Sequence, residues 1–152
     1  MPAGKTQRSG VGIGVKSGES GVKSREPERM TGISRFEEIE AWKKARVLVK
    51  HAYEVTARGS FAKDFALRDQ LRRAAVSIIS NIAEGFSRQT DQEFIQFLFI
   101  AKGSTSEVQS QLYVALDLGY VSDDDFSLCY DIADEVARLL TGFIKYLKGT
   151  GS

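Results

Sequence analysis

Five basic residues are spaced so that they could form one positively charged surface. Lys43, Arg46 and Lys50 step by three and four residues, and Arg68 and Arg72 lie four residues apart. Such spacing places each group on one face of an α-helix. If the two helices lie side by side, the five cations would attract nucleic-acid phosphates without reading base sequence. The alternative is an ordinary solvated face, balanced by nearby carboxylates.

A second set of polar residues shares one face of the segment from about residue 63 to 88. Its members step by three and four residues: Gln70, Arg73, Ser77, Asn81, Glu84 and Arg88. One interpretation is a hydrogen-bonded row that ties helices or subunits together, with Arg73 paired to Ser77 and Asn81 to Glu84. The other is a binding face for a partner protein or a nucleic acid.

The chain offers few groups for catalysis or metal binding. It has one histidine, His51, and one cysteine, Cys129, which exclude an internal disulfide and a thiolate or imidazole metal cluster. Catalysis requires a nucleophile with its base, or paired acids, in a pocket. The remaining enzyme hypothesis uses Glu84, Asn81 and Arg73 in a cleft between subunits. We expect no catalytic site, no metal and no cofactor.

The net charge of +1 conceals an uneven distribution. Residues 1–29 carry six basic and three acidic side chains, residues 35–73 carry ten and six, and residues 74–152 carry five and eleven. The three segments therefore carry +3, +4 and −6. The five basic residues lie in the second segment, and repeating that segment around the axis of a symmetric oligomer would sum its field.

The N-terminal part of the 152-residue chain differs in composition from the rest. Residues 1–32 contain seven of the fourteen glycines, both prolines and no aromatic residue, which predicts a flexible tail. Its Gly10-Val-Gly12-Ile-Gly14 run lacks the strand and helix of a phosphate-binding loop. Translation could start at Met1 or at Met30. Residues 33–149 are the expected domain.

From Thr31 onward the sequence contains no proline, and apolar residues recur at spacings of three and four. This pattern predicts an all-α fold. We expect four helices, over about residues 35–57, 63–86, 91–118 and 123–148. Short connections make neighbouring helices antiparallel, which predicts an up-down-up-down four-helix bundle. No window offers the about 18 apolar residues that a membrane-spanning helix needs, so we expect a cytoplasmic protein without membrane contact.

Side chains at the starts of these segments match known helix caps. Ser34 with Glu37, and Thr90 with Glu93, have the spacing of capping boxes. Ser122 precedes three aspartates, which suit the positive end of a helix dipole. These residues fix the expected starts of the first, third and fourth helices.

Apolar residues on the expected third helix follow a heptad pattern. The inward set steps alternately by four and three: Phe94, Leu98, Ala101, Thr105, Val108, Leu112 and Ala115. This spacing predicts a seam that packs into the bundle core. The expected inward set of the first helix is Ile39, Trp42, Ala45 or Arg46, Val49, and Ala52 or Tyr53.

The first turns of the third helix are apolar on nearly every side. Phe97, Phe99 and Ile100 lie off the heptad seam. One bundle covers one side of a helix, so the rest of this surface needs another cover. We therefore expect a homo-oligomer whose subunit interface includes these residues.

The second helical segment carries a recognisable motif. Its sequence from Gln70 to Arg88, QLRRAAVSIISNIAEGFSR, closely resembles the signature of the four-helix-bundle family that includes the 23S ribosomal RNA intervening-sequence proteins. The flanking run FEEIEAWKKA at 36–45 supports the likeness. Ile79 stands where the family usually has proline, and the segment before Met30 has no counterpart.

The resemblance implies an antiparallel bundle that assembles as a homopentamer. Related proteins include the accessory variability determinant of diversity-generating retroelements, in which a basic surface contacts nucleic acid and a reverse transcriptase. Residues 35–152 of this chain sum to −2, which is less basic than a dedicated nucleic-acid binder.

Together these patterns predict a bacterial, non-enzymatic oligomer that binds RNA or DNA weakly and without sequence preference through the five basic residues. The alternative is a protein-interaction scaffold, or an accessory subunit of a partner enzyme such as a reverse transcriptase, that does not bind nucleic acid itself. A salt-dependent mobility shift separates these hypotheses.

Overall fold

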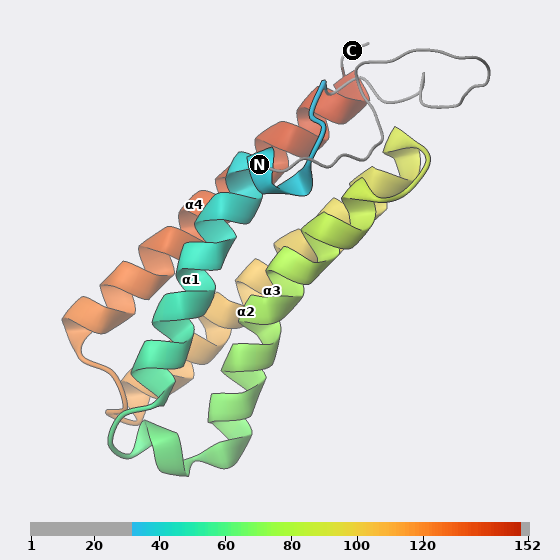
Figure 1. Cartoon of the computed structure of the whole chain (residues 1–152). Helices are drawn as coiled ribbons and strands as arrows, with labels where there is room; N and C mark the ends of the chain where they lie inside the picture. The colour runs from blue at the N-terminus through green and yellow to red at the C-terminus, as the bar shows by residue number, and fades with distance from the viewer. Residues whose placement is uncertain (1–31, 150–152) are drawn as a thin grey trace, which may run out of the picture.

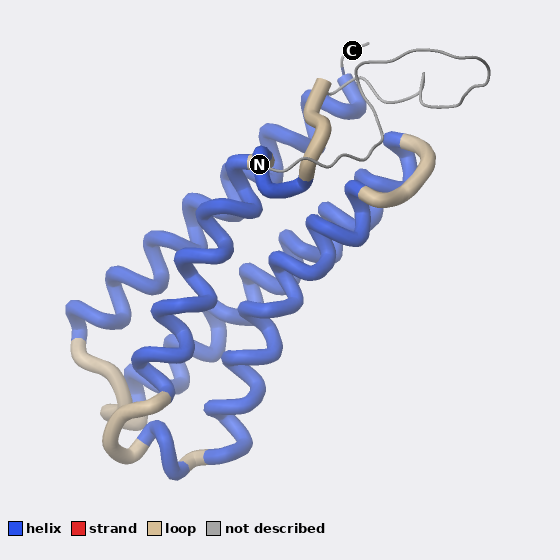
Figure 2. Tube along the Cα trace, in the orientation of Figure 1, coloured by secondary structure: helices blue, strands red, loops and turns tan. Residues whose placement is uncertain are grey.

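Four long helices run alternately up and down the molecule (Figure 1). The computed structural model describes residues 32–149. The main helices are α1 (Glu40–Thr56), α2 (Phe65–Phe86), α3 (Asp91–Asp117) and α4 (Asp123–Gly149), and short 3₁₀ turns η2 (Phe36–Glu38) and η3 (Phe61–Lys63) precede α1 and α2. No strand occurs within this range, so the predicted all-α four-helix fold is confirmed (Figure 2).

The tail expected over residues 1–32 lies, up to residue 31, outside the described residues. The same holds for the glycine run and for both candidate start sites, Met1 and Met30.

The helices occupy the four corners of the bundle in chain order. α1 packs mainly against α2 and α4, and α3 packs mainly against the same two helices. α1 and α3 therefore lie at opposite corners (Figure 1). The outer face of α1 and the outer face of α3 are consequently separate surfaces of the molecule.

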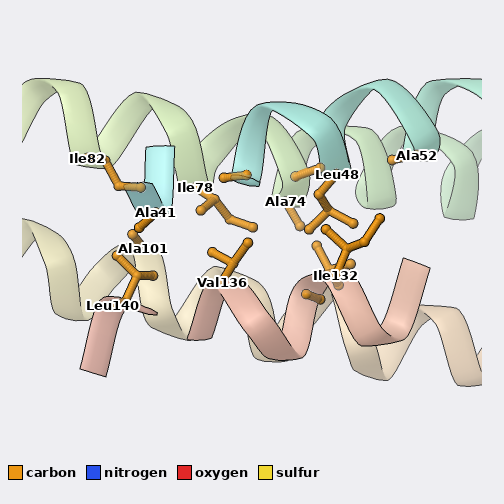
Figure 3. Close-up of a cluster of buried hydrophobic side chains, with 14 of the residues drawn as sticks. Ala41, Leu48, Ala52, Ala74, Ile78, Ile82, Ala101, Ile132, Val136 and Leu140 are labelled. Carbon is orange, nitrogen blue, oxygen red and sulfur yellow. The ribbon is translucent and has the colours of Figure 1, made fainter. Parts of the chain in front are cut away.

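All four helices contribute to the buried core. Leu48 of α1, Ile78 of α2 and Val136 of α4 are fully buried and belong to one hydrophobic cluster (Figure 3). The heptad set predicted on α3 is confirmed, because all seven side chains are at most 1% exposed. An a/d-type seam of this kind is what a four-helix bundle needs for close packing.

The inward face of α1 differs in part from the prediction. Its buried apolar residues are Ala41, Ala45, Leu48, Ala52 and Val55, which step by four, three, four and three. Val49 and Trp42 are half-buried at the margin of this face, whereas Arg46 and Tyr53 are exposed. Three of the five buried apolar residues are thus alanines, and the larger rings of Trp42 and Tyr53 lie outside the buried face.

The start of α1 corrects another prediction. The helix begins at Glu40 rather than near residue 35, because Ile39 has an extended backbone that separates α1 from the preceding 3₁₀ turn. The capping box of Ser34 with Glu37 is wrong. The Ser34 amide and hydroxyl instead donate to the Glu38 carboxylate at 3.2 and 3.3 Å, and Glu37 pairs with Arg35 at 3.1 Å.

The hydroxyl caps expected at Thr90 and Ser122 are present. The Thr90 hydroxyl accepts from the Glu93 amide at 3.2 Å, and the Ser122 hydroxyl accepts from the Asp125 amide at 3.0 Å. Asp64 caps α2 by accepting from the Leu67 amide at 3.1 Å. Its second carboxylate oxygen accepts from the Tyr120 hydroxyl at 2.9 Å, which ties the start of α2 to the turn between α3 and α4.

The single cysteine gives a direct test of core packing. Cys129 is buried on α4, and desolvation raises the pKa of its thiol from 9.0 to about 11. At pH 8 we expect the native protein to react with a thiol reagent at least about a hundredfold more slowly than the unfolded chain, since the thiolate is the reactive form. Ellman's reagent with and without guanidinium measures both rates. Equal rates would show that α4 is not packed as described.

Candidate nucleic-acid interface

Three cations lie along the exposed side of α1. Lys43, Arg46 and Lys50 are all exposed, and their spacing of three and four residues places them on one face. Lys43 pairs with Glu40 at 3.3 Å, and the Arg46 guanidinium lies 5.7 Å from the centre of the Trp42 ring. The predicted α1 half of the basic surface is therefore present as a row on the helix surface.

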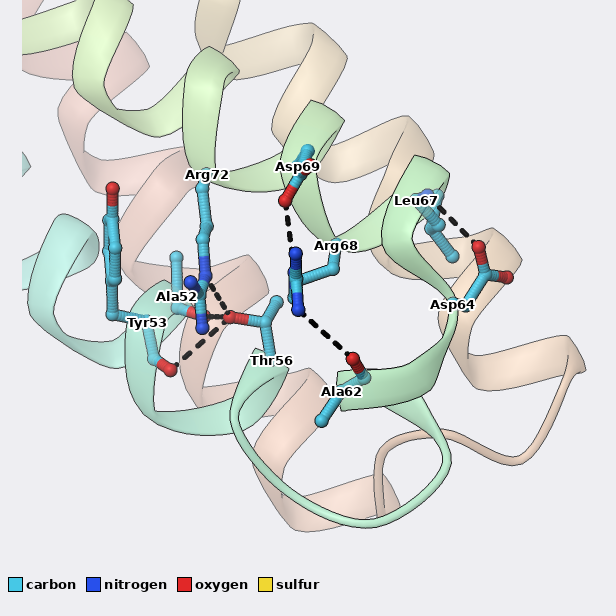
Figure 4. Close-up of polar contacts among 9 residues, drawn as sticks. All are labelled: Ala52, Tyr53, Thr56, Ala62, Asp64, Leu67, Arg68, Asp69 and Arg72. Carbon is cyan, nitrogen blue, oxygen red and sulfur yellow. Dashed lines mark hydrogen bonds and ion pairs between the residues drawn. The ribbon is translucent and has the colours of Figure 1, made fainter.

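The two α2 arginines are held at the corner where α1 passes into α2 (Figure 4). Arg72 donates from Nε to the Thr56 hydroxyl at 2.8 Å. Arg68 donates from Nη1 to the Ala62 carbonyl at 3.1 Å and from Nε to the Asp69 carboxylate at 2.9 Å. Both side chains are half-buried. They therefore stabilise the corner in addition to presenting charge, a role that the spacing did not reveal.

Thr56 connects the two helices at this corner. Its side chain is fully buried, and its hydroxyl donates to the Ala52 carbonyl at 2.7 Å while accepting from Arg72 (Figure 4). Arg72 also lies over the Tyr53 ring, with its guanidinium carbon 4.5 Å from the ring centre. Because Tyr53 is three residues beyond Lys50, the α1 row of cations continues through Tyr53 to Arg72. We call these five residues, Lys43, Arg46, Lys50, Arg68 and Arg72, the basic stripe.

Carboxylates offset part of the charge of the basic stripe. Glu40 pairs with Lys43, and Asp69 pairs with Arg68 at 2.9 Å. The hydrogen bond from Arg68 lowers the pKa of Asp69, so this group remains an anion. Among residues 32–149, no carboxylate lies within ion-pair distance of the other three members, Arg46, Lys50 and Arg72. These three cations carry the net positive charge of the stripe.

The sequence model of the 23S rRNA-intervening sequence protein family matches residues 37–142. The chain belongs to this family. The match extends from the turn before α1 through most of α4 and therefore contains the whole basic stripe. Among curated proteins, none matches the chain.

A solved structure has the same fold as this family member. It is a protein with unknown function from the S23 ribosomal protein family of Bacteroides thetaiotaomicron VPI-5482. The two chains are 23% identical, with a TM-score of 0.64, and the likeness covers 69% of this chain and 98% of the other. At this identity the likeness supports the bundle fold alone.

We call the polar residues on one face of α2 and in the turn after it the polar row, and they are Gln70, Arg73, Ser77, Asn81, Glu84 and Arg88. A side-chain hydrogen bond connects this row to α3. The Asn81 amide donates to the carbonyl and the hydroxyl of Ser77 at 2.8 and 3.0 Å. The Ser77 hydroxyl lies 3.0 Å from the Ser104 hydroxyl of α3. Arg88 pairs with Glu84 at 3.0 Å and also lies 4.7 Å from the centre of the Phe97 ring.

These bonds differ from the pairs that the sequence suggested. The side chains pair as Ser77 with Asn81 and Glu84 with Arg88, rather than as Arg73 with Ser77 and Asn81 with Glu84. The short Asn81 side chain reaches back one turn to the Ser77 carbonyl, and Glu84 is bound by the longer Arg88. Gln70 and Arg73 are exposed at the start of the row. The hydrogen-bonded centre of the row thus joins α2 to α3.

The other side chains considered for chemistry are His51 and Cys129. His51 lies 3.3 Å from Glu54, one turn away on α1. Cys129 is buried in the core.

Within the described range, no three His, Cys, Asp or Glu residues gather as a metal-binding group. No helix in that range is long and apolar enough to cross a membrane.

Sequence reasoning missed the aromatic partners of the basic stripe. The Phe65 ring lies 4.8 Å from the guanidinium of Arg68, and its side chain is 64% exposed. Either Ala52 or Tyr53 was expected to face the core, and the structure buries Ala52 and leaves Tyr53 43% exposed. The spacing of Trp42 with Arg46, and of Phe65 with Arg68, is one helical turn and could have indicated these pairs.

Proposed function

We propose that this family member is a non-enzymatic oligomer that binds RNA or DNA weakly and without sequence preference through the basic stripe. The observation that carries this proposal is the row of three exposed cations on α1. Two of them, Arg46 and Lys50, have no carboxylate at ion-pair distance within the described residues. Each phosphate neutralised by such a cation releases a condensed counterion, which favours binding at low salt.

The location of the basic stripe supports its repetition in an oligomer. The outer face of α3, at the opposite corner from α1, exposes apolar side chains: Phe99, Ile100, Tyr113, Val114 and Leu118. Their exposed fractions range from 44% to 55%. We propose that this face contacts other copies, in the homopentamer that the family resemblance implies. Contact through α3 leaves α1 accessible, so each copy adds its own cations to the assembly.

Replacing Lys43, Arg46 and Lys50 with glutamine tests the proposed function. These three side chains are exposed, so the substitutions should not alter folding, whereas changing Arg72 would leave the buried Thr56 hydroxyl without its donor. We expect the triple variant to lose most of its retention on RNA and on duplex DNA at low salt. A gel mobility shift with sequences of different composition measures the loss.

The matched control replaces three basic residues of α3 and α4 with glutamine: Lys102, Arg138 and Lys145. This control changes the net charge equally but leaves the basic stripe intact, so it should be retained much more strongly than the stripe variant. Equal retention of wild type and both variants would contradict the proposal. That result would favour the scaffold or accessory-subunit alternative, which remains a prediction.

A further inference from the structure

Two exposed aromatic rings lie against arginines of the basic stripe. Phe65 is 64% exposed and Tyr53 is 43% exposed. The guanidinium carbon of Arg68 lies 4.8 Å from the centre of the Phe65 ring, and that of Arg72 lies 4.5 Å from the centre of the Tyr53 ring. Arg46 over Trp42 forms a third pair of this kind on α1. Solvent therefore reaches aromatic surface beside several cations.

Phe65, Arg68, Arg72 and Tyr53 form a row with an aromatic ring at each end and two arginines between them. Phe65, Arg68 and Arg72 follow one another at spacings of three and four on α2, and Tyr53 of α1 lies next to Arg72. Figure 4 shows Tyr53, Arg72 and Arg68 in this order at the α1–α2 corner. The row thus reads aromatic, cation, cation, aromatic across two helices.

Hydrogen bonds fix the two arginines before any ligand arrives. Thr56 accepts from Arg72, and the Ala62 carbonyl together with Asp69 accepts from Arg68. A fixed side chain loses little conformational entropy when it binds a partner, which favours binding. Since Asp69 offsets the charge of Arg68, the phosphate contacts of this row fall mainly to Arg72 and to neighbouring Lys50.

We propose that this row binds single-stranded nucleic acid, with unpaired bases stacked on Tyr53 and Phe65 and phosphates at Arg72 and Lys50. Aromatic platforms combined with cations are the general means by which proteins hold single strands without reading sequence. In a duplex the faces of the bases are covered by neighbouring base pairs, so exposed rings add nothing to its binding. This inference rests on the proposed function and assigns a strand preference to it.

Leucine substitutions at the two rings test the strand preference. Phe65→Leu and Tyr53→Leu keep apolar bulk and change no charge. We expect each to weaken the binding of a labelled oligothymidylate by about tenfold. The binding of a duplex of equal length should change by less than about twofold. Fluorescence anisotropy with the full chain measures both affinities, and circular dichroism verifies helix content.

Conservative variants and a distant tyrosine provide the controls. Phe65→Tyr and Tyr53→Phe retain an aromatic ring and should bind the single strand as the wild type does. Tyr146→Leu removes a ring that is 47% exposed on α4 and should also leave binding unchanged. The strand preference is overturned if the leucine variants bind as the wild type, or if they lose duplex binding equally. Absence of binding to either probe by the wild type would overturn the proposed function as well.

Discussion

Replacing Gly85 with alanine is expected to lower the free energy of unfolding by about 2 kcal/mol. A Cβ atom at this position would lie 2.6 Å from the Cβ of Phe97, 2.9 Å from Cδ1 of Phe94 and 3.3 Å from the Phe94 carbonyl oxygen. Phe94 is fully buried between Phe86 and Phe143, so its ring has no room to move away. The missing side chain at Gly85 permits the close approach of α2 and α3.

Gly142→Ala is the matched control for this substitution. Gly142 lies within α4, and a Cβ atom there would meet nothing within 4 Å. Alanine has the higher helix propensity, so this variant should be more stable by about 0.5–1 kcal/mol. Guanidinium unfolding at one fixed protein concentration gives both values. An unchanged or raised stability of Gly85→Ala would show that α2 and α3 are not as close as described.

Glutamate at both Ile100 and Val114 is expected to convert the proposed oligomer into a monomer. These residues are 53% and 44% exposed, and they lie two heptads apart on the outer face of α3. Two charged groups in an apolar interface would have to be buried without partners, which costs several kcal/mol. Sedimentation velocity should show a several-fold loss of mass with unchanged helix content.

Leu128→Glu serves as the control for this experiment. Leu128 is 45% exposed on α4, outside the α3 face, and its replacement should leave the oligomer intact. A wild-type protein that sediments as a monomer would contradict the proposed assembly, as would a double variant that sediments like the wild type.

The buried face of α3 could be predicted because its apolar residues follow a strict periodicity. The seven-residue seam of α3 reads directly from the sequence, since only one face of that helix has a continuous heptad pattern. α1 was harder to orient because its buried positions are mostly alanines, whose small side chains give a weak signal. The sequence therefore left Ala52 and Tyr53 as alternatives for one inward position, and packing buries Ala52 and exposes Tyr53.

The positions of the charged residues in the candidate site could be predicted from the sequence, but their side-chain contacts could not. Spacing located Lys43, Arg46 and Lys50 on one face, because an exposed helix follows its own period. The bond from Arg72 to Thr56 joins residues that are 16 positions apart and depends on how two helices meet at a corner. The row from Phe65 through Arg68 and Arg72 to Tyr53 likewise emerged only from the folded chain.

For the apolar residues of α3 as well, side-chain contacts could not be predicted from spacing. Phe97, Phe99 and Ile100 were expected to share a subunit interface, yet Phe97 is half-buried under Arg88. Phe99 and Ile100 are exposed, as the interface hypothesis requires. Arg88 reaches Phe97 across the turn between α2 and α3. Tertiary packing therefore decides which apolar residues a charged side chain covers.

The salt dependence of binding shows most directly whether the α1 cations neutralise phosphates. The logarithm of the association constant for duplex DNA should fall linearly with the logarithm of salt concentration. Removing Lys43, Arg46 and Lys50 together should make that slope shallower by about 3, one unit for each lost phosphate contact. An identical slope for the wild type and the triple variant would contradict the account.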